Sequence, residues 1–303
     1  MRRAGREGLP TGGRVALADS PGVPGATSDG PDGPDSADLA VIPAALRRAA
    51  AALGMSEEAV VPLGGASRRT WGCGEHVLRI GLPDVLDREV LAMGAASSVL
   101  AVPRVLDRVE FIDERGHKRA ALLLTRLPGR PAGDLTGVSP QQARRRGEAC
   151  GALHAVLASV VPPPGLRREL GPPLPREEHA KTVQPRPCLL HLDLHPLNVL
   201  IDRAGEVSGV LDWANTAAGA AVLDRARTWS ILTLDPSALA LQGQPGWAAL
   251  TSGWARTAGF DDLPAAARAW ACRVMLDDLA GRYRADALEH VWRSLRVYDR
   301  ASS

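Results

Sequence analysis

The clearest pattern in the chain is a polar loop followed by two short apolar runs. The loop is His191 to Asn198, and the runs are Val199 to Ile201 and Val207 to Leu211. Runs of this length, separated by polar residues, are typical of two strands joined by a turn. The pattern predicts a β-hairpin, with the polar loop before its first strand and Asp212 after its second.

Before this hairpin, short apolar runs alternate with turn residues, and after it apolar positions recur at helical spacing. Strands are expected at residues 59–63, 70–71, 76–80, 103–112 and 119–124, with helices at 43–53, 84–96 and 139–157. Further helices are expected at residues 224–234, 247–257, 264–283 and 285–298. Ser139-Pro140 is a helix start, with Ser as N-cap and Pro in the first turn. The pattern predicts an α+β fold.

Residues 1–38 differ from the rest of the chain in composition. They are rich in Gly, Pro, Ser and Asp and contain no aromatic residue. Such a segment buries too little apolar surface to offset the entropy lost on ordering. We expect a disordered tail that carries no chemistry.

The hairpin predicts a site as well as a fold. Asp193, Asn198 and Asp212 are expected to converge at one end of a small sheet. Phosphoryl transfer needs such a group, because one carboxylate orients or deprotonates the attacking hydroxyl. An amide oxygen and a second carboxylate can hold magnesium on the phosphates.

This pattern resembles the aminoglycoside phosphotransferase/choline kinase-like family, whose usual form is H-G-D-x-H-x-x-N followed by I-D-W or I-D-F. The chain reads HLDLHPLN and then LDW. The resemblance implies a protein kinase-like two-lobed fold, with a small antiparallel-sheet N-lobe and a larger helical C-lobe. The N-lobe, residues 39–127, would bind the nucleotide, and residues 128–303 would supply the catalytic loop and acceptor pocket.

The resemblance also implies roles for single residues. Asp193 would be the catalytic base, and Asn198 and Asp212 would bind Mg²⁺. His191 would fix the loop by hydrogen bonding. The implied reaction moves the γ-phosphoryl group of ATP, the co-substrate, to a hydroxyl of a small molecule, either an antibiotic or a metabolite.

The sequence motifs for nucleotide binding are less specific than those of the polar loop. The chain has no G-x-x-x-x-G-K-[ST] motif, but a glycine-rich turn between strands can offer backbone N–H groups to phosphates. By position, Arg79 takes the place of the kinase Lys that contacts the phosphates, and Glu89 on the next helix would pair with it. The expected nucleotide-binding residues are Gly64, Gly65, Ser67, Arg79 and Glu89, with Thr125 and Leu127 at the adenine edge.

The chain departs from the family pattern in three places. Leu192 and Leu197 stand where Gly is usual, and 219–221 reads Gly-Ala-Ala where relatives often have G-D-P. Larger residues occur at the two leucine positions in protein kinases, so the loop is expected to survive. Asp224 is retained, and both it and His154 are expected to be structural.

Composition and charge indicate which partners and which location to expect. A net charge of +2 is too small to indicate nucleic-acid binding. The four cysteines are far apart and form no C-x-x-C pair, which favours reduced thiols and a cytoplasmic location. The chain has no apolar run of about 18 residues and no secretory h-region, so we expect no membrane partner. Either a monomer or a homodimer fits.

Three alternatives stay open for function. The chain could phosphorylate a metabolite, phosphorylate an antibiotic, or be a catalytically silent nucleotide- or partner-binding module. Aminoglycosides are polycations and would favour an acidic pocket. From Cys188 onward the chain has 13 acidic residues against 11 Arg, which is not a strongly acidic lobe.

Overall fold

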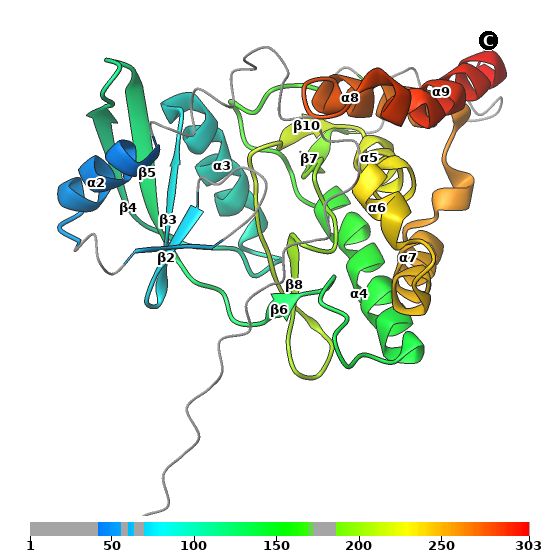
Figure 1. Ribbon diagram of the computed structural model, residues 1–303, viewed down its shortest axis with the longest axis horizontal. Coiled ribbons are helices and arrows are strands. Elements are labelled where there is room, and N and C mark those ends of the chain that lie inside the picture. The colour runs from blue at the N-terminus through cyan, green and yellow to red at the C-terminus, as the bar shows by residue number, and fades with distance from the viewer. Residues whose placement is uncertain (1–41, 56–59, 64–69, 170, 172–185, 303) are drawn as a thin grey trace, which may run out of the picture. The chain divides into compact units, whose positions relative to one another are not determined.

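The computed structural model describes residues 42–55, 60–63, 70–169, 171 and 186–302 (Figure 1). The predicted tail lies outside this part of the chain, and so do Gly64, Gly65 and Ser67 of the glycine-rich turn. The polar loop and its hairpin are described from end to end.

An antiparallel sheet of five strands makes up most of the N-terminal part. The strands lie in the order β1-β2-β3-β5-β4, and each pairs antiparallel with its neighbour. They are β1 Val61–Pro62, β2 Thr70–Cys73, β3 His76–Gly81, β4 Val105–Ile112 and β5 Lys118–Thr125, with helices α2 Ile42–Ala52 and α3 Pro83–Ala96.

The two helices pack on opposite faces of this sheet (Figure 1). Leu78 of β3 packs with Ala49 of α2, whereas Leu122 of β5 belongs to the core that includes Leu86 of α3. Arg79 is the neighbour of Leu78 in β3 and pairs with Leu122 across the sheet. Because successive side chains of a strand point to opposite faces, Arg79 is on the α3 face.

Helices dominate the C-terminal part. They are α4 Pro140–Ala158, α5 Ala221–Leu234, α6 Pro236–Leu241, α7 Pro245–Ala258, α8 Ala265–Leu279 and α9 Glu289–Ser302, with short 3₁₀ turns η2 Phe260–Asp262 and η3 Ala285–Leu288. Ser139 caps α4 as predicted, because Gln142 N–H donates to its side chain and the Gln142 side chain accepts from Ser139 N–H. The predicted antiparallel N-terminal sheet and helical C-terminal part are confirmed.

Glycines allow α4 and α7 to pack backbone against backbone. A Cβ atom added to Gly147 would lie 1.9 Å from the carbonyl oxygen of Leu250, and one added to Gly253 would lie 2.2 Å from that of Arg144. Both distances are far below van der Waals contact. Only glycine fits at these two positions.

Two small sheets hold the polar loop in place. One pairs β7 Cys188–Leu190 with β10 Ala217–Gly219, and the other has the order β6-β8-β9, with β6 Arg130–Pro131, β8 Val199–Ile201 and β9 Val207–Val210. The predicted hairpin is β8 and β9. The chain leaves β7 at Leu190, forms the loop and enters β8 at Val199. Both ends of the loop are therefore fixed by strand pairing.

The structure adds elements that the sequence pattern does not predict. The strands β6, β7 and β10 have two or three residues each, too few to show a period of two. Helix α5 begins at Ala221, three positions before the expected start at Asp224. The segment 219–221 therefore ends a strand and begins a helix.

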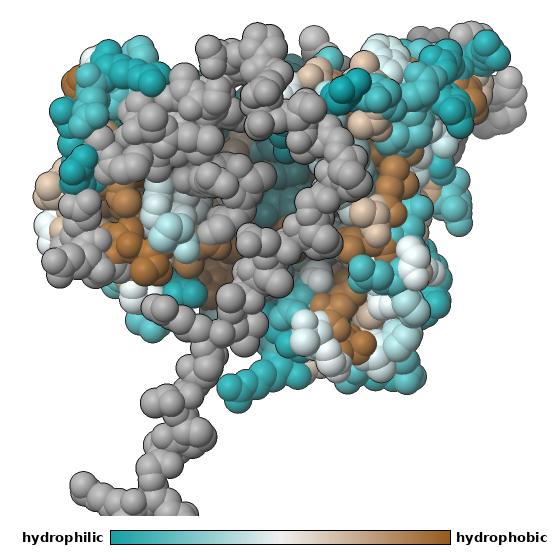
Figure 2. All heavy atoms as spheres, viewed as in Figure 1, coloured by the Kyte–Doolittle hydropathy of each residue, from teal (hydrophilic) through white to brown (hydrophobic). Residues whose placement is uncertain are grey.

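The described surface shows two further features. None of its helices is both long and apolar enough to cross a membrane. Exposed large apolar residues, such as Ile112, Val161 and Val297, are far apart in the chain. On the face seen in Figure 2, hydrophobic residues (brown) and hydrophilic residues (teal) are intermixed, and some of the hydrophobic surface lies over the region of α5 and α6.

Candidate active site

Asp193 and Asn198 contact each other within the polar loop. Nδ2 of Asn198 donates to the backbone oxygen of Asp193 at 2.9 Å and to its Oδ2 at 3.3 Å. The side chain of Asp193 remains 25% exposed. A carboxylate that is held in this way and is still accessible can take a proton from an approaching hydroxyl.

Asp212 lies at the same end of the hairpin as Asn198. The backbone N–H of Leu211 donates to the backbone oxygen of Asn198 at 2.8 Å, directly beyond the Val199–Val210 pair of the ladder. Asp212 is the next residue, so the structure brings the three predicted residues to one end of the small sheet.

His191 holds the loop against the hairpin. Its side chain is fully buried, Nε2 lies 3.0 Å from the backbone oxygen of Leu211, and Nδ1 accepts from the N–H of Asp193 at 3.2 Å. The ring also packs against Trp213, with the centroids 4.9 Å apart. Since a carbonyl only accepts, Nε2 carries the proton. Both nitrogens have partners, which agrees with the predicted positioning role.

Arg79 links the N-terminal sheet to Asp212. Its Nη2 lies 2.8 Å from Oε1 of Glu89 and 2.8 Å from Oδ1 of Asp212, while its Nε lies 2.7 Å from Oε2 of Glu89. Burial by itself lowers the pKa of Arg79, but the charges of the two carboxylates outweigh it and raise the pKa overall. The predicted pair of Arg79 and Glu89 is present, and Asp212 makes it a cluster of three charges.

A buried hydrogen-bond network, which the sequence pattern does not predict, fixes the backbone of the polar loop. Oδ1 of Asp224 accepts from the backbone N–H groups of His191 and Leu192 at 2.9 and 2.8 Å, and Oδ2 lies 2.8 Å from Nδ1 of His154. Trp254 Nε1 donates to Nε2 of His154 at 3.3 Å. Asp224 and His154 are structural as expected, but they act on the loop rather than on a helix start.

The Asp224 carboxylate stays ionised in this network. Burial raises its pKa, but the hydrogen bonds from His154 and the Leu192 N–H act in the opposite direction, and the pKa is lowered overall. A charged acceptor suits three donors better than a neutral one does. The loop backbone is therefore tied to a fixed negative charge.

His195, which the sequence pattern left without a role, sits beside the site. Its Nε2 lies 3.1 Å from Nδ2 of Asn198 and 3.8 Å from Oδ1 of Asp193. Burial lowers the pKa of His195, although Asp193 acts in the opposite direction. The second histidine of HLDLHPLN was the available signal.

The segment predicted to hold the adenine edge has most of its backbone donors in use. The N–H of Thr125 donates to the Arg104 oxygen at 2.9 Å, and that of Arg126 donates to the Glu75 oxygen at 3.0 Å. Thr125 Oγ1 accepts from Arg104 N–H. Among the described residues, the Leu127 N–H has no backbone partner.

The two residues predicted to bind a metal carry oxygen atoms of the kind that magnesium prefers. Mg²⁺ prefers carboxylate and carbonyl oxygens and is usually held by one or two protein ligands together with substrate phosphates. Asn198 and Asp212 supply one amide and one carboxylate oxygen. Within the described part, no three His, Cys, Asp or Glu side chains could hold a metal ion. The pair therefore fits an ion that the nucleotide helps to bind.

The fold and site together define a two-lobed, kinase-like protein. A model of the phosphotransferase enzyme family matches residues 60–183 and 166–260, and the chain belongs to this family. None of the curated proteins compared with the chain matches it.

Solved structures share the fold. A thermostable mutant of aminoglycoside phosphotransferase APH(4)-Ia, in a ternary complex with ADP and hygromycin B, is 16% identical, with a TM-score of 0.55 over 85% of this chain and 98% of that one. A mutant of aminoglycoside 2′-phosphotransferase-IIIa in complex with GDP is 15% identical, with a TM-score of 0.54 over 88% of this chain and 97% of that one.

Proposed function

We propose that the chain transfers the γ-phosphoryl group of ATP to a hydroxyl of a small molecule. The observation that carries this proposal is that Asp193 and Asn198, which contact each other, lie at the same end of the hairpin as Asp212, with Arg79 reaching Asp212 from the N-terminal sheet. Membership of the phosphotransferase family supports it. The nucleotides in the two solved structures, ADP and GDP, leave the choice between ATP and GTP to experiment.

Asp193 is the catalytic base in this proposal. Its Oδ2 accepts from Asn198, while Oδ1 lies 3.8 Å from His195, beyond hydrogen-bond distance. Oδ1 is thus the freer oxygen to accept the proton of the acceptor hydroxyl. The hydroxyl oxygen attacks the γ-phosphorus, the bond to the β-phosphate oxygen breaks, and ADP leaves. Holding the two reactants in line supplies much of the rate enhancement.

Asn198 and Asp212 would hold Mg²⁺ in this proposal, and the ion would neutralise charge on the nucleotide phosphates. Arg79, steadied by Glu89, contacts the phosphates. In the structure Nε and Nη2 of the same guanidinium contact Glu89 and Asp212, whereas Nη1 makes a single 3.4 Å contact with Thr70 Oγ1 and keeps an N–H for a phosphate. The contact with Asp212 keeps that carboxylate paired with a positive charge before metal and nucleotide arrive.

The acceptor is a small molecule with a hydroxyl group, and the family name does not identify it. A screen of hydroxylated metabolites and antibiotics with radiolabelled ATP tests the reaction directly. With an accepted substrate, Asp193→Asn should lower kcat by about 10² to 10⁴ while ATP affinity changes little. Asp261→Asn, an exposed Asp in η2, is the matched control. Turnover by Asp193→Asn at the rate of the control would refute the assigned base.

Magnesium-dependent ATP binding separates an enzyme from a silent module. ATP should raise Tm in the presence of Mg²⁺, and Asp212→Ala should remove most of that rise. If ATP raises Tm equally with and without Mg²⁺, and no acceptor is phosphorylated, the silent nucleotide-binding module is the better description.

A further inference from the structure

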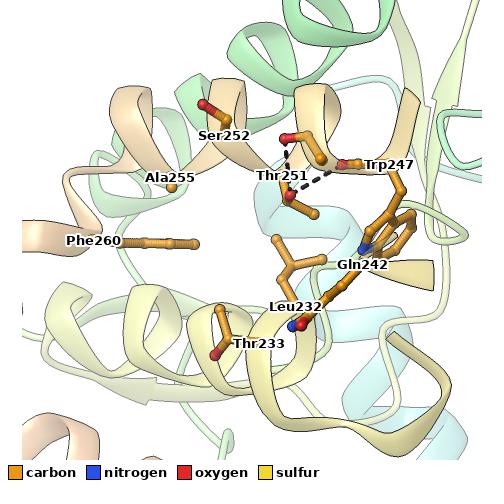
Figure 3. A pocket seen from close by; sticks show the side chains of 9 residues that line it. Leu232, Thr233, Gln242, Trp247, Thr251, Ser252, Ala255 and Phe260 are labelled. Carbon is orange, nitrogen blue, oxygen red and sulfur yellow. Dashed lines mark hydrogen bonds between the residues drawn. The ribbon is translucent and has the colours of Figure 1, made fainter. Parts of the chain in front are cut away.

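A hollow lies between α5 and α7, and the residues proposed for catalysis and metal binding are not among those that line it (Figure 3). Its volume is about 290 Å³. The walls include the apolar side chains of Leu232, Trp247 and Phe260, and polar groups come from Thr233, Gln242 and Thr251. No charged residue lines it. The size is just below the range of about 300–1,000 Å³ that is usual for pockets that bind small molecules.

The indole N–H of Trp247 is a buried donor without a partner. The side chain is only 8% exposed, and Nε1 has no hydrogen-bond partner among the described residues. By contrast, the indole of Trp213 donates to the Val210 oxygen at 3.1 Å and that of Trp254 donates to His154. Figure 3 shows the Trp247 nitrogen on the side of the ring that faces Gln242.

A ligand can supply an acceptor to this donor if it displaces a neighbouring side chain, because Nε1 is itself buried in the free chain. A buried N–H that lacks an acceptor is unfavourable, and a ligand oxygen within hydrogen-bond distance of Nε1 would remove that cost. The rest of the wall favours apolar atoms. The absence of charged lining residues disfavours a polycation, since burying a charge without a partner is costly. The chemistry of the hollow therefore selects an uncharged ligand with an apolar body and one acceptor oxygen.

Each of the two helices that form the hollow is connected to the polar loop, α5 by a direct hydrogen bond and α7 through the segment around Leu135. Thr228 of α5 donates to the backbone oxygen of Leu194 at 2.8 Å, and Leu232 follows one turn later, about 6 Å along the helix. At the first turn of α7, a Cβ added to Gly246 would lie 3.3 Å from the Leu135 side chain. The N–H of Gly133, two residues before Leu135, donates to the Pro196 oxygen at 2.9 Å.

We propose that this hollow is a binding site for a small uncharged molecule, which presents an oxygen to the Trp247 indole and apolar atoms to Leu232 and Phe260. The molecule is either the phosphate acceptor itself or a separate effector of the enzyme. An acceptor and an effector would make the same contacts with the hollow, and their binding can be measured without nucleotide. Failure of the site therefore leaves the proposed phosphotransfer untouched.

Two probes of equal shape test the site. Acetophenone carries the acceptor oxygen, and α-methylstyrene has a CH₂ group in its place. Each is titrated into ¹⁵N-indole-labelled protein while the Trp247 indole signal, assigned by its absence in Trp247→Phe, is followed by NMR. Acetophenone should move that signal downfield, and α-methylstyrene should not. The exposed Trp292, at 44% exposure on α9, is the internal control and should not move with either probe.

Affinities give a second, independent reading. The ratio of acetophenone affinity to α-methylstyrene affinity should fall about tenfold from the wild type to Trp247→Phe, the worth of one hydrogen bond. Ala255→Leu, which fills the hollow from α7, should weaken both probes at least tenfold. An unchanged Trp247 signal, or a ratio that is the same in wild type and Trp247→Phe, would overturn the proposal.

Kinetics then separate the two sources of the ligand. With an acceptor found by the screen, acetophenone that raises KM without changing kcat shares the acceptor's site. Acetophenone that changes kcat without raising KM marks an effector site. Either result supports the hollow as a ligand site. No effect on either parameter at a concentration that saturates the Trp247 signal refutes both roles.

Discussion

The substitution Asp224→Asn tests how the polar loop is held. Asp224 is 3% exposed, and its side chain accepts three hydrogen bonds, two of them from the loop backbone. Asparagine has nearly the same shape but places an NH₂ group where one carboxylate oxygen was. The substitution changes hydrogen bonding without opening a cavity.

No arrangement of asparagine satisfies every donor of the network. If its oxygen keeps the two backbone N–H groups, its NH₂ group faces Nδ1–H of His154. A change of tautomer at His154 would then direct Nε2–H at the indole N–H of Trp254. Rotating the amide instead turns NH₂ toward the N–H groups of His191 and Leu192. In each case at least one buried donor meets another donor.

The magnitude follows from this count. One unmatched buried donor costs about 1–3 kcal/mol, and hydrogen bonds to a neutral acceptor are weaker than those to a carboxylate. We expect Asp224→Asn to lower the free energy of unfolding by about 2–4 kcal/mol. Urea unfolding followed by tryptophan fluorescence measures this as a lower midpoint at an unchanged m-value. Asp261→Asn, exposed in η2, should change stability by about 0.5 kcal/mol or less.

The effect should depend on pH in a defined direction. The pKa of Asp224 is lowered in the folded chain, with burial opposed and outweighed by the hydrogen bonds from His154 and Leu192. A carboxylate of this kind stabilises the fold above its unfolded pKa of about 3.9, and the contribution is lost as the pH falls through the lower folded value. The gap between wild type and Asp224→Asn should be constant above about pH 5 and shrink below pH 4. Equal midpoints at pH 7, or a gap that widens in acid, would refute the reasoning.

Three more predictions concern packing, the nucleotide and the thiols. Gly253→Ala should lower the free energy of unfolding by about 2 kcal/mol or more in the same urea assay, because its Cβ would lie 2.2 Å from a backbone oxygen of α4. Gly94→Ala in α3 is the control: its Cβ would meet nothing within 4 Å, and it should raise the free energy of unfolding by up to about 1 kcal/mol. Arg79→Lys should weaken ATP binding about tenfold by calorimetry, because an ammonium cannot replace the two-sided contact of the guanidinium with Glu89; unchanged affinity would argue against a phosphate contact. All four cysteines are buried, and burial raises the pKa of Cys150 to about 12, so a thiol reagent at pH 8 should label none of them until urea unfolds the chain.

The sequence predicts those parts of the site that depend on neighbours in the chain. Asn198 and Asp212 lie at the same end of the hairpin because the strands between them pair, and a short apolar pattern predicts that pairing. Arg79 lies on the α3 face because side chains alternate along a strand, and Glu89 lies on the next helix. In each case the placement of the two residues follows from local geometry and one turn.

The rest of the site depends on packing between distant segments. Asp224 and His154 are 70 positions apart, and Trp254 is 100 positions from His154. No periodicity in the sequence joins them, since their contact exists only once α4, α5 and α7 have packed together. The close approach of α4 and α7 rests on Gly147 and Gly253, which in the sequence look like weak points of two helices.

The backbone is in an unusual conformation at Leu192, one of the positions where the sequence departs from the family pattern. Among the described residues, Leu192 and Asp212 are the non-glycine residues with positive φ, at 60° and 58°. A side chain in this left-handed region costs about 1–2 kcal/mol, which explains why glycine is usual at the position of Leu192. Leu192 offsets that cost by burying its side chain, 5% exposed, and by donating its N–H to Asp224. The network below the loop thus lets a leucine adopt a conformation that elsewhere would call for glycine, and strain persists where the surrounding contacts fix the backbone.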